Sequence, residues 1–163
     1  MRVVKQRLLE MMPDSSVFLD VDDLQEGRGA EYVDKSMVIL ICCTRGYFDS
    51  VNCMRELLRA VYDGKPLIAL LEPEARRGGM TRDEVSKALR EVHDEGSYAK
   101  WGLDAELQQW GMQPPTHLYN ILFADTPIEW NRIGAFQVCL PCPCLPAARY
   151  MGAIFYDRVI PYL

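Results

Sequence analysis

The stretch MVILICCT occupies residues 37–44, and two similar apolar runs accompany it, VFLDV at 17–21 and PLIALL at 66–71. Each run is too short for a typical buried helix and is rich in strand-forming residues. Continuous apolar runs of this kind suit parallel strands that are buried on both faces. We therefore predict three buried parallel strands in the first half of the chain.

Helical patterns separate these strands. Apolar residues recur at helical spacing in residues 3–12, 30–36 and 51–62. Asp49 and Ser50 are both candidate N-caps for the third of these helices. Alternation of helix and strand with short loops is typical of an α/β fold, here a flavodoxin-like parallel sheet with helices on both faces. Ligands of such sheets bind at the carboxyl ends of the strands.

In the second half of the chain, the predicted helices and strands alternate less regularly. Thr81 begins a charged helix that runs to about His93 through a Thr-x-x-Glu capping box. Residues 95–115 are predicted as a loop with one short helix around 104–110. The remaining predictions are a strand at 118–124, a helix that opens at 126–129 and runs towards residue 138, and a Pro/Cys-rich tail at 139–163.

Composition limits the classes of function. The chain has 163 residues, 49% of them apolar and 25% charged, which suits one soluble domain. Its net charge of −5 provides no basic surface for nucleic acid. No apolar stretch is long enough to span a membrane, and the first residues lack the pattern of a signal peptide. We expect a cytoplasmic protein with mostly reduced cysteines.

Four segments resemble one known family in register and in order. They are VFLDVDDLQEG (17–27), MVILICCT (37–44), SVNCMREL (50–57) and GKPLIALLEPE (64–74). Together they are similar to the second strand, the third strand, the following helix and the fourth strand of Toll/interleukin-1 receptor (TIR) domains. The resemblance implies a TIR-like domain at 1–138, with the core match at 1–75, an insertion at 76–117 and a late strand and helix at 118–138.

Two departures from the family pattern stand out. No strand precedes the first helix, whereas the first strand of TIR domains lies centrally, between the second and third. A central vacancy would leave backbone groups of both neighbouring strands unpaired. Either the chain is a fragment, or the segment 150–156 fills the gap. Asn52 also stands where many TIR domains have tryptophan.

The resemblance implies a catalytic residue. Some TIR domains are NAD glycohydrolases, which release nicotinamide with a single glutamate in the helix that here contains CMREL, and the matching residue is Glu56. A carboxylate suits this reaction because departure of nicotinamide creates an oxocarbenium-like centre that an anion stabilises. On the helix, Glu56 lies beside the small residues Cys53 and Ala60, which leave room for a ligand.

Residues at the strand ends complete the candidate site. The dinucleotide contacts that we expect come from Asp20, Asp22, Arg45, Tyr47 and Cys53. An aromatic ring could stack on a base, and an arginine could pair with pyrophosphate. NAD is thus a candidate substrate, and no permanently bound cofactor is expected.

Each assignment has a structural alternative. Glu56 could be a solvated helix residue paired with Arg55 or Arg59, and the aspartates could form Asx-type turns. Cys139, Cys142 and Cys144 have a spacing that can bind zinc, but no fourth ligand is evident nearby, so no metal site is predicted.

Three functions follow from these alternatives. The first is NAD cleavage in a self-associating TIR assembly. The second is a non-catalytic signalling module, of the kind used in innate immunity, that binds other TIR domains. The third is a different flavodoxin-like domain, which would share the fold without the family's activity.

Overall fold

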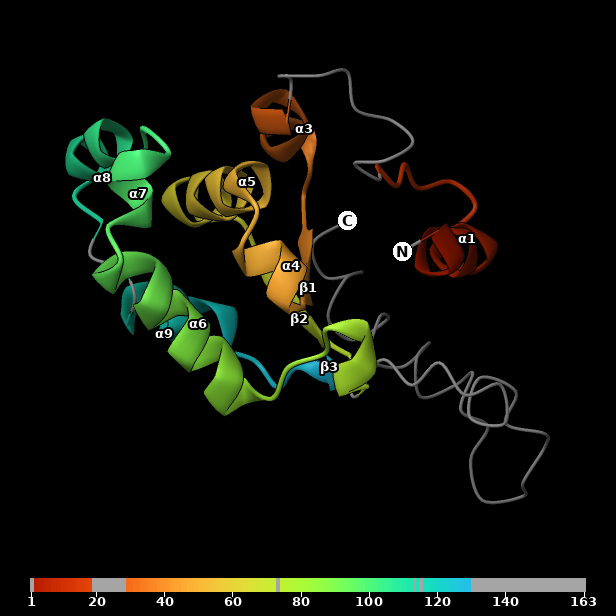
Figure 1. The fold of residues 1–163 in the computed structure, drawn as a ribbon. Helices are drawn as coiled ribbons and strands as arrows, with labels where there is room; N and C mark the ends of the chain where they lie inside the picture. The colour runs from red at the N-terminus through yellow and green to blue at the C-terminus, as the bar shows by residue number, and fades with distance from the viewer. Residues whose placement is uncertain (1, 19–28, 73, 113, 115, 130–163) are drawn as a thin grey trace.

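The computed structural model describes residues 2–18, 29–72, 74–112, 114 and 116–129 (Figure 1). These residues form a mixed helix and strand structure around a small parallel sheet. β1 (Ile39–Cys43) pairs with β2 (Leu67–Leu71) along its whole length, and β2 pairs with β3 (Ile128–Glu129). The predicted α/β class is confirmed, as are two of the three strands predicted in the first half.

The connection between β1 and β2 is the part that positions the candidate site. It contains the short helix α4 (Arg45–Phe48) and the longer α5 (Val51–Tyr62). Of the two candidate N-caps, Ser50 is the one used, because its Oγ accepts a hydrogen bond from the N–H of Cys53 at 3.4 Å. The bounds predicted for α5 are correct.

Helices cover both faces of the described sheet. Alternate residues of β2 face opposite sides, and all five are buried, so each face packs against helices. On one face, Ile68 and Leu70 form a core with Val4 and Leu8 of α1 (Arg2–Met11). On the other face, Ala69 belongs to the larger core, to which α5, α6 and α9 contribute. Figure 1 shows α1 on one side of the strands and α5, α6 and α9 on the other.

The remaining helical segments are α3 (Gly29–Lys35), the 3₁₀ turn η1 (Ala75–Arg77), α6 (Arg82–Asp94), α7 (Ser97–Lys100), α8 (Asp104–Trp110) and α9 (Thr116–Leu122). The predicted capping box of α6 is present in both directions, between Thr81 and Glu84. No helix in the described part of the chain is long and apolar enough to cross a membrane.

Two predictions in the second half are wrong. Residues 118–124 were expected to form a strand, but most of them belong to α9, whose Leu118 and Leu122 are buried one helical turn apart. Residues 126–129 were expected to open a helix, but Ile128 pairs with Leu70 and extends the sheet as β3. The short helix α7 lies in a stretch that was expected to be loop.

Several predictions fall outside the described residues. Val17 and Phe18 have no strand conformation, and the rest of the strand predicted at 17–21 is not described. The same holds for Asp20 and for the loop that contains Asp22, for most of the helix expected towards residue 138, for the tail at 139–163 and for the segment 150–156. Those predictions stay untested.

Candidate functional site

The carboxyl end of β1 is held against the turn that follows β2. Thr44, directly after the strand, forms an antiparallel bridge with Gly79. The N–H of Arg45 donates to the carbonyl oxygen of Gly78 at 2.9 Å. Backbone interactions alone therefore hold the carboxyl end of β1 against this turn.

Tyr47 links the residues that were predicted for the candidate site. It projects from α4, is half-buried, and packs edge-on against the fully buried ring of Phe48, with 5.4 Å between ring centroids. Burial raises the pKa of its phenol well above the usual value, and the nearby charges of Cys53 and Glu56 raise it further. Three of the residues predicted for the site, Tyr47, Cys53 and Glu56, are thus neighbours.

Glu56 lies half-buried on α5, on the flank that faces Tyr47. Arg59 was considered as its ion-pair partner on the helix. The Nε of Arg59 lies 3.1 Å from Asp34 and 2.9 Å from Asp63. The carboxylate of Glu56 is near enough to Tyr47 to raise the pKa of its phenol.

The space beside Glu56 is smaller than expected from the sequence. Ala60 was expected to leave room for a ligand, but it is fully buried in the main core. Cys53 remains half-buried at the first turn of α5.

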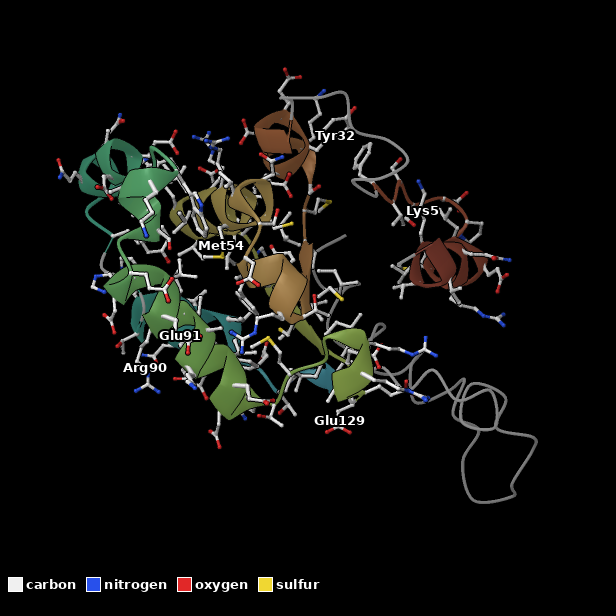
Figure 2. All side chains as sticks on the ribbon, viewed as in Figure 1. Lys5, Tyr32, Met54, Arg90, Glu91 and Glu129 are labelled. Carbon is white, nitrogen blue, oxygen red and sulfur yellow. The ribbon has the colours of Figure 1, made fainter. Side chains whose placement is uncertain are left out.

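Arg45 points away from this group. Its Nη1 lies 3.1 Å from a carboxylate oxygen of Glu91, and both side chains are exposed. Glu91 belongs to α6, which packs against α4 (Figure 2). A pyrophosphate contact from Arg45 would require this ion pair to open. Asp20 and Asp22, the other predicted contacts, lie outside the described residues.

Two residues near the site were not singled out from the sequence. Glu72, directly after β2, is only 1% exposed, and its Oε1 accepts a hydrogen bond from the N–H of Glu74 at 3.3 Å. Cys43, the last residue of β1, is fully buried, and burial raises the pKa of its thiol to about 12. The strand pattern could have marked both, since each stands at the carboxyl end of an apolar run.

A separate cavity of about 390 Å³ lies where α6, α7 and α8 meet. Its described lining includes neither Glu56 nor the other residues predicted from the TIR resemblance. The cavity and the Tyr47 site are thus two distinct features of the fold.

Comparison of the chain with protein-family models, with curated proteins and with solved structures found no match.

Proposed function

We propose that this chain is a TIR-like α/β domain of flavodoxin-like topology that cleaves NAD, with Glu56 acting at the ribosyl centre. The observation that carries the proposal is that Cys53 and Glu56 are near enough to Tyr47 to raise the pKa of its phenol. The three residues come from two helices, and two of them, Cys53 and Glu56, lie in the TIR-like segment SVNCMREL.

The order of the strands supports the proposed topology. Flavodoxin-like sheets have the strand order 2-1-3-4-5, in which the last three strands are consecutive neighbours. The described sheet has the order β1-β2-β3, all parallel. Under the resemblance, β1 and β2 correspond to the third and fourth strands of the family, and β3 then takes the fifth position.

The chemistry follows from the carboxylate of Glu56 and the phenol of Tyr47, which interact electrostatically. In the proposed reaction, nicotinamide leaves the ribose, the carboxylate of Glu56 stabilises the positive charge that develops there, and water then adds to the same ribosyl carbon and releases a proton. Because its pKa is raised by burial and by neighbouring charges, the phenol of Tyr47 keeps its proton at neutral pH. It can therefore donate a hydrogen bond to the carboxamide of nicotinamide while its ring packs against the base.

The test is nicotinamide release from NAD, measured by chromatography at high protein concentration with and without a crowding agent, because enzymes of this family work as assemblies. Glu56→Gln keeps the size of the side chain and removes its charge, so we expect release to fall by at least about a hundredfold, as for loss of a transition-state contact. The matched control is Glu10→Gln, on the exposed surface of α1 across the sheet. It should release nicotinamide at the wild-type rate.

Tyr47→Phe removes the hydroxyl and keeps the ring, so it tests the contribution of the hydroxyl alone. If the hydroxyl binds the carboxamide, this variant should lose about tenfold in kcat/KM, which corresponds to one hydrogen bond of about 1.4 kcal/mol. Equal rates in wild type and Glu56→Gln, with circular dichroism showing both proteins folded, would contradict the enzymatic proposal.

A second candidate function is a cytoplasmic, non-catalytic module that binds other TIR domains in signalling. The burial of Ala60 favours it, because this burial removes part of the space expected for a dinucleotide. Analytical ultracentrifugation together with the NAD assay distinguishes the two functions. Self-association without nicotinamide release supports the module, whereas release that depends on Glu56 supports the enzyme.

A further inference from the structure

The cavity at the junction of α6, α7 and α8 is built from a chain reversal at each end. Gly96 separates α6 from α7 with φ of 65°, and Gly111 ends α8 with φ of 61°. Glycine adopts this left-handed conformation without the steric cost that a Cβ would add. The two reversals bring the end of α6, the start of α7 and one side of α8 around a common space.

The inner wall of the cavity is apolar and aromatic. Tyr98 and Leu107 are buried there, and Met112 is half-buried beside them. Tyr98 in turn packs edge-on against Trp101, with 6.1 Å between ring centroids. A wall of this composition suits the apolar body of a small ligand, and a volume of about 390 Å³ is within the usual range for ligand sites.

The rim of the cavity is polar. The exposed side chains of His93, Asp104 and Gln108 line it, and the Nδ1 of His93 lies 3.1 Å from a carboxylate oxygen of Asp94. The described lining contains no lysine or arginine. The rim therefore presents carboxylate and amide oxygens, which are acceptors for a cationic donor.

Tyr98 lines the cavity through atoms other than its hydroxyl. The hydroxyl oxygen is inaccessible to solvent and has no hydrogen-bond partner among the described residues. The surface that Tyr98 presents to a ligand is therefore without a phenol donor.

We propose that this cavity binds a small aromatic amine. The aromatic ring lies against Tyr98, Leu107 and Met112, and the protonated amine pairs with the carboxylate of Asp104 at the rim. The site is independent of the proposed activity at Glu56, whose side chain is not part of the lining.

The first test is an NMR titration of the whole chain at pH 7.5 with three molecules of similar shape and different charge. They are phenethylamine, 2-phenylethanol and 3-phenylpropionate. We expect phenethylamine to bind with Kd of about 1 mM and to shift the signals of Leu107 and Met112. The neutral alcohol should bind about fivefold more weakly, which is the effect of one exposed ion pair, and the anion more weakly still.

Two pairs of variants on α8 locate the site. Asp104→Asn should weaken phenethylamine binding about fivefold and leave 2-phenylethanol unaffected. Its control, Glu106→Gln, removes a charge from the same helix outside the lining and should change neither. Gln108→Trp should block the cavity and abolish binding of both molecules. The exposed neighbouring Gln109→Trp should bind both normally.

Each result decides for or against the proposal. Equal affinity for all three molecules, tightest binding of 3-phenylpropionate, or shifts that map away from α8 would overturn it. Unchanged binding in a folded Gln108→Trp variant would do the same. Nicotinamide release from NAD is measured separately, so failure of this site leaves the proposal for Glu56 untouched.

Discussion

The backbone of Gly79 lies directly against the carbonyl oxygen of Glu72, so closely that a side chain at position 79 would collide with it. A Cβ at this position would also lie 2.8 Å from the carbonyl oxygen of Glu74. This contact closes the turn after β2 and brings Gly79 into its bridge with Thr44. The carboxyl ends of β1 and β2 are therefore joined through a position that only glycine can occupy.

Gly79→Ala should consequently destabilise the fold. Because both obstructing atoms belong to the backbone, the turn must move, and we expect a loss of about 2–4 kcal/mol in the free energy of unfolding. Urea denaturation measures it. Gly46→Ala is the matched control, since a Cβ there meets nothing within 4 Å and the residue lies inside α4. The control should be neutral or up to about 1 kcal/mol more stable. Equal stability of the two variants would contradict the role of Gly79.

The capping box of α6 gives a second prediction. The Oγ1 of Thr81 accepts the N–H of Glu84 at 3.3 Å, and the N–H of Thr81 donates to the carboxylate of Glu84 at 2.7 Å. Thr81→Ala should cost about 1 kcal/mol in thermal or urea unfolding, because one N–H of the first turn loses its acceptor. Glu84→Gln retains a side-chain acceptor and should cost less than Thr81→Ala. The reverse order would show that charge, rather than the hydrogen bonds, stabilises this helix end.

The junction between α5 and α8 rests on an aromatic pair. The rings of Tyr62 and Trp110 are stacked, with 4.8 Å between centroids and 19° between planes. A double-mutant cycle with Tyr62→Ala and Trp110→Ala should give a coupling of about 0.5–1.5 kcal/mol. Strictly additive effects on the free energy of unfolding would show that the two rings stabilise the fold independently.

Alkaline pH should destabilise the protein through Cys43. Burial, followed by the charge of Cys42, raises the pKa of its thiol from 9.0 to about 12. The unfolded chain therefore loses this proton first, and the stability that is present below pH 9 declines as the pH rises towards 12. We expect the slope to approach about 1.4 kcal/mol per pH unit for this group.

Cys43→Ala should reduce that slope between pH 9 and pH 10 in urea unfolding. Ile41→Val is the control because Ile41 is buried in the same strand and the substitution introduces no ionisable group. It should lower stability uniformly and keep the wild-type slope. The raised pKa of Tyr47 adds a further decline above pH 10, in the same direction.

The sequence predicted best the elements whose local pattern agrees with their tertiary surroundings. β1, α5 and β2 have uninterrupted apolar patterns of the right length, and the packing follows them. The capping box of α6 could be predicted equally well, because the Thr81–Glu84 interaction lies within one helical turn.

The predictions that were wrong concern short segments whose apolar spacing fits both a strand and a helix. Residues 118–124 contain strand-forming residues, yet Leu118 with Leu122, and Tyr119 with Phe123, are each four residues apart, as on one face of a helix. Ile128 became a strand because the edge of β2 was available to it, which no local pattern reveals. Pro127, which would lie in the first turn of the helix predicted to open at 126–129, is also compatible with the start of a strand.

The candidate site was predictable in part for the same reason. Cys53 and Glu56 lie in the TIR-like segment SVNCMREL, and Tyr47 is near them because α4 and α5 follow β1 with a short connection between them. Arg45 differs because its partner Glu91 comes from α6, a helix outside the resemblance. The burial of Ala60 depends on the core as a whole and could not be predicted from α5 alone.

The central position of β2 also bears on the order in which the protein folds. β1 and β2 are close in sequence, and α5 connects them, so this unit closes only a modest loop when it forms. β3 joins β2 from a distant part of the chain and adds two paired residues in the part of the chain that the structure describes. The β1–α5–β2 unit should therefore assemble early and exchange its amide protons last, whereas β3 attaches late and exchanges first.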